Sequence, residues 1–330
     1  MYVNNRDFMF IPYIQNINIS FFYHRNKRKI IRINRLELIS LFNTFQRSRV
    51  PPNRLGERHI MNSPELFFSC NTVVCDLDGT LYLEDTLLPA ALEFTHRILD
   101  SGRQLFYFTN NTSKSRATYL AKFSSLGLPA EDSFLITAAD CADDYLKRSG
   151  LHPEIYLVGN RDLKKEFGQR GFNCLGEEET GKTPPRAVVL GFDTELTYAK
   201  IKTCYDLILA KTPYIATHAD LLCPLARGRF MPDVGSFISL FETATGGLRP
   251  HVVGKPTGEA VRAICGRAGQ PPGKVAFVGD RLYTDMRMAA RHGMVGVLVL
   301  SGETSADMAA RSPDQPKLMV NGVADLIDGL

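Results

Sequence analysis

The chain has 330 residues, of which 44% are hydrophobic and 22% are charged, and its formal net charge is +4. This length corresponds to about two domains, and the composition excludes a wholly disordered or fibrous protein. The seven cysteines are scattered without a close pair, which argues against a zinc knuckle or a disulfide framework and for a reducing compartment. We therefore expect a globular, cytoplasmic protein.

The first 60 residues differ from the rest of the chain, because they carry 11 Lys and Arg against 3 Asp and Glu. We predict that residues 1–60 are a disordered or dispensable extension; an organelle-targeting leader and a nucleic-acid-binding arm are the alternatives. Since no nucleic-acid-binding module accompanies the basic residues, we expect no nucleic-acid partner. The apolar stretch 8–23 is interrupted by polar residues and is shorter than the roughly 18–20 residues of a membrane span, so we expect no membrane partner.

From residue 72 onward, runs of β-branched and aromatic residues alternate with helical patterns. This alternation is typical of a parallel sheet with crossover helices, so the predicted fold class is α/β. The predicted strands are residues 73–77, 104–110, 154–159, 187–193, 213–218, 274–280 and 295–300. The predicted helices are residues 89–100, 113–126, 198–210, 236–245 and 257–268. Apolar residues at helical spacing, such as Leu120 and Phe123, indicate faces packed in a core.

Several predicted strands end in polar residues. Asp76 and Asp78 close the first strand, Thr109 and Asn110 close the second, and Asp280 closes the strand at residues 274–280. In an open α/β sheet, ligands bind beyond the carboxyl ends of the strands. We therefore expect these side chains to converge, although they are far apart in the chain.

Two early segments carry residue types that suit phosphate chemistry. Residues 73–82 place Asp76 and Asp78 at a Gly-containing turn, although this segment taken alone is also compatible with a turn that has no further role. Thr109 offers a hydroxyl beside backbone N–H groups near the start of a helix, which suit a phosphate.

Two later segments add to this set. Lys255 supplies a point charge for a phosphoryl oxygen, and Asp280 and Asp285 supply two further carboxylates. Together the four segments place groups that suit a phosphate, and four carboxylates, at the predicted carboxyl edge of the sheet.

The order of these motifs resembles that of the haloacid dehalogenase superfamily of phosphohydrolases. The motifs DxDGT, strand-end Thr, Lys and GDxxxxD occur in that order. The finer resemblance is to the NagD-like or p-nitrophenylphosphatase-like branch, and residues 109–116, 191–198, 215–224 and 252–260 carry it. The resemblance covers about residues 70–320. It implies a Rossmann-like parallel-sheet core with an inserted smaller α/β cap domain.

The resembling branch carries its cap between the Thr and Lys motifs, where this chain has too many residues for one crossover. We therefore expect a catalytic core of residues 61–145 and 233–330 and a cap of residues 146–232. Similar proteins form cap-mediated dimers, so a homodimer is compatible with the resemblance.

The resemblance implies a Mg²⁺-dependent phosphatase that acts on a small phosphorylated metabolite, such as a nucleotide, sugar phosphate or phosphoglycolate. Asp76 would attack phosphorus and form an aspartyl-phosphate, while Asp78 would act first as general acid and then as general base. Mg²⁺ would be held by Asp76, the backbone carbonyl of Asp78 and Asp280, with Asp285 supporting the site from its edge. Because halide departure needs no general acid, Asp78 also argues for phosphoryl transfer over dehalogenation.

The resemblance also assigns the remaining site residues. Thr109 and Lys255 would hold the transferring phosphoryl group, with Asn110 helping through its backbone. From the cap, His218 and Asp220 would face the pocket and select the substrate. The branch commonly has Asn where this chain has His218, so substrate specificity does not carry over, and a histidine that only packs at a strand end is the alternative.

Two alternatives compete with this hypothesis. Residues 176–183 match the pattern of a phosphate-binding loop, but three successive Glu would repel phosphate, and Pro184 and Pro185 follow where a helix should begin. A solvated acidic loop is the better interpretation. The other alternative is a phosphate-ligand-binding relative without significant turnover, against which the presence of both Asp76 and Asp78 argues.

Overall fold

The computed structural model describes residues 63–225 and 229–330. These residues lie in one compact unit. The predicted N-terminal extension lies outside the described residues, so its role stays a prediction.

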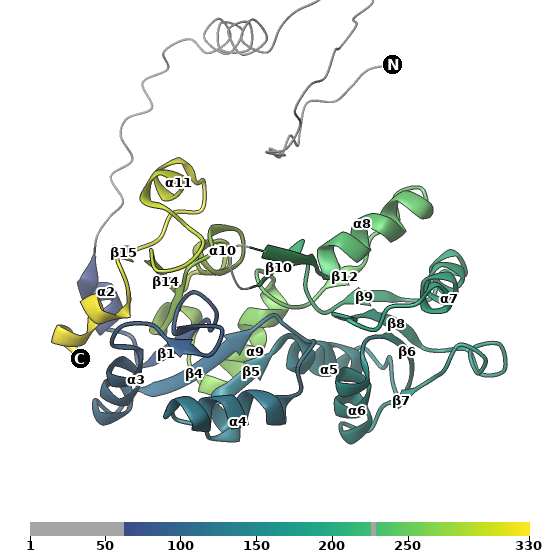
Figure 1. Cartoon of the computed structure of the whole chain (residues 1–330), viewed down its shortest axis with the longest axis horizontal. Coiled ribbons are helices and arrows are strands. Elements are labelled where there is room, and N and C mark those ends of the chain that lie inside the picture. Colours follow the sequence, from purple (N-terminus) through teal and green to yellow (C-terminus); the bar gives the residue numbers. More distant parts are fainter. Residues whose placement is uncertain (1–62, 226–228) are drawn as a thin grey trace, which may run out of the picture. The chain divides into compact units, whose positions relative to one another are not determined.

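The larger of two parallel sheets has six strands in the order β15-β14-β13-β1-β4-β5 (Figure 1). Its strands are β1 (Thr72–Cys75), β4 (Gln104–Thr109), β5 (Leu135–Thr137), β13 (Val275–Gly279), β14 (Val295–Val299) and β15 (Leu318–Val320). Val74 packs in one hydrophobic cluster, whereas Val73 and Cys75 pack in another. The sheet is therefore buried on both faces, which explains why its strands are continuous apolar runs in the sequence.

The second parallel sheet has five strands in the order β12-β9-β8-β6-β7. Its strands are β6 (Glu154–Val158), β7 (Asn173–Cys174), β8 (Ala187–Leu190), β9 (Tyr214–Ala216) and β12 (His251–Val252). Three of them, β6, β8 and β9, are the strands predicted for the cap. The segment 146–232 does not contain the whole sheet, however, because β12 lies beyond it. The domain limits themselves stay a prediction.

Two antiparallel hairpins follow polar segments of the chain. β2 (Tyr82–Leu83) pairs with β3 (Thr86–Leu87) shortly after Asp78. β10 (Leu222–Leu225) pairs with β11 (Arg229–Pro232) directly after the loop that follows β9. Both hairpins contribute residues to the cavity described below.

The helices connect these strands, and the five predicted ones are confirmed as α3, α4, α7, α8 and α9. The helices of the described residues are α2 (Pro64–Phe68), α3 (Ala91–Asp100), α4 (Arg116–Leu126), α5 (Ala138–Arg148), α6 (Arg161–Gln169), α7 (Tyr198–Leu209), α8 (Val234–Ala244), α9 (Gly258–Ala268), α10 (Arg287–His292) and α11 (Ala306–Arg311). Ser115, Thr197 and Thr257 cap α4, α7 and α9 by accepting backbone N–H groups of the first turn. Within the described ranges, no helix is long and apolar enough to cross a membrane.

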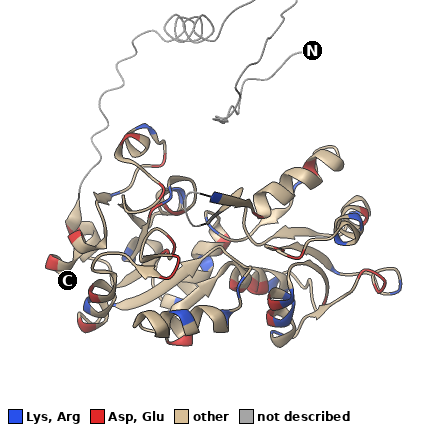
Figure 2. Cartoon of the chain, viewed as in Figure 1, with Lys and Arg blue, Asp and Glu red and all other residues tan. Residues whose placement is uncertain are grey.

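The sequence prediction did not include β5, α5 and α6. Both helices place apolar residues such as Cys141, Ala142 and Leu163 in the core, and Figure 2 shows acidic and basic residues side by side on them. Arg170 at the end of α6 pairs with Asp140 and Asp143 of α5 at 2.7 and 3.3 Å. These partly buried ion pairs add to the apolar packing of α5 and α6, and they depend on how the two helices lie against each other, which no local pattern predicts.

Candidate active site

Side chains at the ends of three adjacent strands lie at one edge of the larger sheet. Asp76 follows β1, Thr109 ends β4 and Asp280 follows β13, and in the sheet β1 lies between the other two strands. The N–H of Asp76 donates to the carbonyl oxygen of Val278 at 2.8 Å, which continues the parallel ladder into the site. All three side chains are buried. The parallel topology thus brings together Asp76 and Asp280, which are more than 200 positions apart in the chain.

Asp76, Asp280 and Asp285 form a buried cluster of carboxylates, in which one oxygen of each lies within 4.8 Å of the others. Burial raises the pKa of Asp280 to about 8, and the charges of Asp76 and Asp285 add to this effect. Burial also raises the pKa of Asp285 to about 6, although Lys255 opposes the shift. Among the described residues, Asp280 Oδ1 is buried without a hydrogen-bond partner. Full ionisation of the cluster is therefore unfavourable without a further positive charge.

Lys255 is the cation of this cluster. Its Nζ lies 2.7 Å from Asp76 Oδ1 and 2.8 Å from Asp285 Oδ1, and its side chain is only 3% exposed. Burial by itself would lower the pKa of Lys255, but the carboxylates of Asp285 and Asp76 outweigh this effect and raise it. Lys255 is therefore a fixed positive charge beside Asp76.

Asp78 lies in the turn after β1 and lines the same cavity. Burial raises its pKa, and the neighbouring charge of Asp76 raises it further, whereas Lys122 and Lys114 lower it. The next residue, Gly79, has φ +84°, and a Cβ atom there would lie 2.5 Å from Asp280 Oδ2. Glycine is therefore required at this position for two reasons, the positive φ of the backbone and the close approach of Asp280 at the end of β13.

Asn110 joins the loop after β4 to two other segments. Its Oδ1 accepts from the Lys255 N–H at 2.9 Å, and its Nδ2 donates to the Lys255 carbonyl oxygen and to Asp220 Oδ1, both at 3.2 Å. The side chain of Asn110 is thus engaged with protein groups. Asp220 lines the cavity and is the cap-loop residue that the structure brings to the predicted site.

His218 does not line the cavity, which corrects the expectation that it faces the substrate. The residue is fully buried. Its Nε2 lies 3.0 Å from Asp233 Oδ1, and its Nδ1 lies 3.0 Å from Thr217 Oγ1. A histidine that packs at the strand end is therefore the interpretation that the geometry supports.

The His218 pair makes fold stability depend on pH. Burial would lower the pKa of His218, but the carboxylates of Asp233 and Asp220 outweigh burial and raise it above its ordinary value of 6.5. The stabilising charge pair is therefore fully present below the ordinary pKa and is lost as pH rises through the higher folded-state pKa. We expect the free energy of unfolding in urea to lose this contribution as pH rises above the ordinary histidine pKa of 6.5, and His218→Asn to remove the loss.

A matched control for this change is His96→Asn, since His96 is exposed on α3. The control should keep the pH dependence of the wild type. An unaltered pH dependence in the His218→Asn protein would contradict the assignment of the charge pair.

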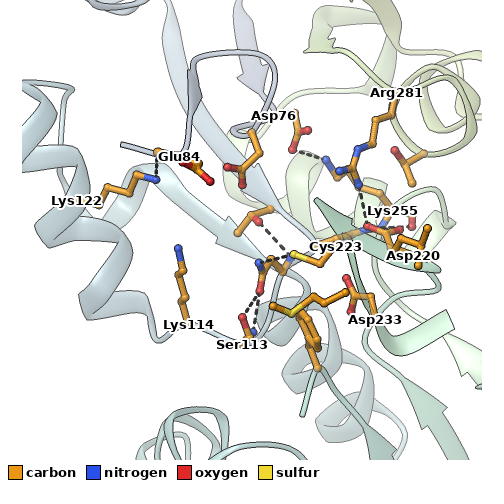
Figure 3. A pocket seen from close by; sticks show the side chains of 18 of the residues that line it. Asp76, Glu84, Ser113, Lys114, Lys122, Asp220, Cys223, Asp233, Lys255 and Arg281 are labelled. Carbon is orange, nitrogen blue, oxygen red and sulfur yellow. Dashed lines mark hydrogen bonds and ion pairs between the residues drawn. The ribbon is translucent and has the colours of Figure 1, made fainter. Parts of the chain in front are cut away.

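Six of the predicted residues line a cavity of about 440 Å³ (Figure 3), namely Asp76, Asp78, Thr109, Asn110, Asp220 and Lys255, whereas Asp280 and Asp285 are not among its lining residues. Three cations that sequence reasoning missed also line it, namely Lys114, Lys122 and Arg281. Arg281 pairs with Asp220 at 3.4 Å and with Glu303 at 3.2 Å. No ion pair is recorded for the Lys114 ammonium within the described part of the chain. Lys114 lies in segment 109–116, which carries the family resemblance, and Arg281 directly follows Asp280. Both could therefore have been predicted from the sequence as site residues.

Other residues that line the cavity come from segments in which no sequence motif predicted a site. Phe192 follows β8, while Leu222, Cys223 and Met231 belong to the β10–β11 hairpin. They give one part of the cavity an apolar or weakly polar lining. In contrast, residues 176–183 form turns between β7 and β8, and none of them lines the cavity.

Comparisons with known proteins agree with this architecture. A family model described as haloacid dehalogenase-like hydrolase matches residues 73–173, and a second, HAD-hydrolase-like model matches residues 252–326. Chronophin of Bos taurus is 31% identical over 274 residues, which cover 78% of this chain and 92% of chronophin. The chloroplastic phosphoglycolate phosphatase 1A of Arabidopsis thaliana is 28% identical over 302 residues, which cover 85% of this chain and 83% of the relative.

Solved structures give the same result. A 4-nitrophenylphosphatase from Thermotoga maritima superposes with a TM-score of 0.74 at 33% identity and covers 80% of this chain and 98% of its own. NagD from E. coli K-12 superposes with a TM-score of 0.71 at 28% identity and covers 79% of this chain and 100% of its own.

A parallel α/β sheet with carboxylates at the ends of its strands, in a chain that matches these relatives, defines the class of phosphohydrolases. The chain belongs to the haloacid dehalogenase-like hydrolases, in their NagD-like branch. It is a phosphoric monoester hydrolase of that superfamily.

Proposed function

We propose that this phosphatase hydrolyses small phosphomonoesters through an aspartyl-phosphate on Asp76. The observation that carries the proposal is the contact of Asp76 with Lys255, 2.7 Å apart, at a cavity that Asp78 also lines. A carboxylate nucleophile, a group that holds phosphoryl oxygens and a second carboxyl group for proton transfer are the parts that such a reaction needs. The names of the relatives, which include phosphoglycolate phosphatase and glycerol-3-phosphate phosphatase, support a small phosphorylated substrate.

The carboxylate cluster fits a divalent cation. When all three are ionised, the carboxylates of Asp76, Asp280 and Asp285 exceed the single positive charge of Lys255, which lies in contact with two of them. The unpartnered Oδ1 of Asp280 is a hard oxygen donor of the kind that Mg²⁺ prefers. We propose that Asp76, Asp280 and the backbone carbonyl of Asp78 hold Mg²⁺, with Asp285 at the edge. Bound there, the ion would offset negative charge on the phosphoryl group.

The chain's own residues would perform the transfer in two steps. In the first, an oxygen of Asp76 bonds to phosphorus, the bond from phosphorus to the ester oxygen breaks, and the proton of Asp78 passes to that oxygen. In the second, Asp78 takes a proton from water, whose oxygen attacks the aspartyl-phosphate and releases inorganic phosphate together with the free carboxylate. The raised pKa of Asp78 favours its role as the proton donor of the first step.

Lys255 and Thr109 would hold the oxygens of the phosphoryl group while it moves. Lys255 keeps its positive charge because of its two carboxylate neighbours, and Thr109 is buried at the end of β4. Fixed charges and donors of this kind stabilise the charge that develops in the transition state without having to reorganise.

The full chain is expected to hydrolyse p-nitrophenyl phosphate with Mg²⁺ and to lose activity by at least about 100-fold in EDTA, because the carboxylate cluster then lacks its counter-charge. Phosphate release from p-nitrophenyl phosphate, phosphoglycolate, glycerol 3-phosphate, nucleoside monophosphates and pyridoxal phosphate would be measured, and added Mg²⁺ should restore the activity. Activity that EDTA leaves undiminished would contradict the metal assignment. Binding of phosphate without turnover of any ester would favour the alternative of a binding protein.

A further inference from the structure

Asp220 has both carboxylate oxygens engaged by the protein. The residue lies on the loop after β9 and is 6% exposed. Its Oδ1 accepts from Asn110 Nδ2 at 3.2 Å, and its Oδ2 lies 3.4 Å from both Asn110 Nδ2 and Arg281 Nη1. Figure 3 shows Asp220 beside Lys255 and Arg281. A carboxylate held in this way is poorly placed to bind a leaving group as well.

The amide that Asp220 contacts holds Lys255 by its backbone. Asn110 accepts from the Lys255 N–H at 2.9 Å and donates to the Lys255 carbonyl oxygen at 3.2 Å. If the amide rotated by half a turn, its oxygen would face the carboxylate of Asp220 and the Lys255 carbonyl oxygen, which is unfavourable. Asp220 therefore adds to the orientation in which Asn110 binds both backbone groups of Lys255, and it holds the Nδ2 end of the amide in place.

The backbone around these residues is closely packed. A Cβ atom on Gly254 would lie 2.7 Å from Asn110 Oδ1 and 2.4 Å from the carbonyl oxygen of Thr217. The Gly254 N–H donates to that same oxygen at 2.7 Å, and the Gly235 N–H donates to the Asp220 carbonyl oxygen at 2.8 Å. The loop that carries Asp220 is thus fixed against the segment that carries Lys255.

We propose that Asp220 is a positioning residue that fixes Lys255 through the side chain of Asn110, and that it does not read the leaving group of the substrate. This inference rests on the proposed function, since it assigns Lys255 to the phosphoryl group. It follows that a substitution of Asp220 weakens the binding of the phosphoryl group. The loss of activity is then the same for esters with different leaving groups.

The first experiment compares Asp220→Ala and Asp220→Asn across three esters, p-nitrophenyl phosphate, phosphoglycolate and glycerol 3-phosphate. We expect Asp220→Ala to lower kcat/KM about 10- to 100-fold, and by the same factor for each ester. The reason is that a displaced Lys255 affects the phosphoryl group, which all three esters share. Asp220→Asn keeps the size and one acceptor oxygen and should recover part of the loss. Asp206→Asn, an exposed change on α7, is the matched control and should lie within about twofold of the wild type.

The second experiment is a double-mutant cycle with Asn110→Ala. If Asp220 acts through Asn110, the double variant should be no worse than Asn110→Ala alone, since the second change removes a contact that is already lost. The same cycle is repeated with the affinity for inorganic phosphate, measured by calorimetry. Inorganic phosphate has no leaving group. If each single change lowers phosphate affinity and the double variant binds phosphate no more weakly than Asn110→Ala, the inference is supported. This result does not depend on turnover, so it tests the inference separately from the proposed function.

Two results would overturn the inference. One is a loss that differs more than tenfold between esters, which would make Asp220 a reader of the leaving group. The other is additivity of the Asp220 and Asn110 changes in both kcat/KM and phosphate affinity.

Discussion

Asp76→Asn is expected to lower turnover of p-nitrophenyl phosphate by about 10⁴-fold or more and to abolish the phosphoenzyme. The amide is a poor nucleophile, and the change removes one carboxylate of the cluster with Asp280 and Asp285. It also removes one of the two negative partners of Lys255, whose Nζ lies 2.7 Å from Asp76 Oδ1. Rapid quench with a phosphate-labelled ester, followed by mass spectrometry of the peptide that contains Asp76, measures the intermediate directly.

The matched control is Asp100→Asn, since Asp100 is exposed at the end of α3, a helix outside the site. Activity of the control should stay within about twofold of the wild type, as expected for a surface substitution. Thermal unfolding of both variants shows whether the loss of the carboxylate has changed the fold. Near wild-type turnover of Asp76→Asn, or a phosphoryl group found on another residue, would refute the assignment of Asp76.

Asp78→Asn is expected to separate the two steps of the reaction. With p-nitrophenyl phosphate, whose leaving group scarcely needs a proton, Asp76 should still be phosphorylated. The intermediate should then decay slowly, because no carboxylate activates the water, and loss of a general base costs on the order of 10²–10⁴ in rate. The measurement is a burst of p-nitrophenol followed by slow release of phosphate, with the phosphoenzyme trapped by acid quench.

Glycerol 3-phosphate is the comparison substrate for this variant. Its alkoxide leaving group does need a proton, so Asp78→Asn should slow phosphorylation itself and no burst should appear. The raised pKa of Asp78, caused by burial and then by Asp76, means that its protonated form persists to a higher pH than that of an ordinary carboxyl group. Equal slowing of the first step for both esters would contradict the assignment of Asp78 as the proton donor.

The sequence by itself determined the α/β class and the residues at the strand ends. Strands buried on both faces, such as β1 and β13, are continuous apolar runs, so a local pattern identifies them. Because parallel strands share one carboxyl edge, the convergence of Asp76, Thr109 and Asp280 followed from the strand assignments without any coordinates. The resemblance to known motifs then gave each residue a proposed role.

Only the tertiary structure decided which groups satisfy one another. Asn110 and Asp220 lie 110 positions apart and carry no mutual signal in the sequence. The two-residue strand β12 is too short for a periodic pattern, so its place in the second sheet comes from its pairing with β9. His218 could equally have faced the substrate or the core, and its burial against Asp233 decided between them. Hydrogen bonds and ion pairs between distant segments depend on how the two sheets pack, which no local pattern of residues encodes.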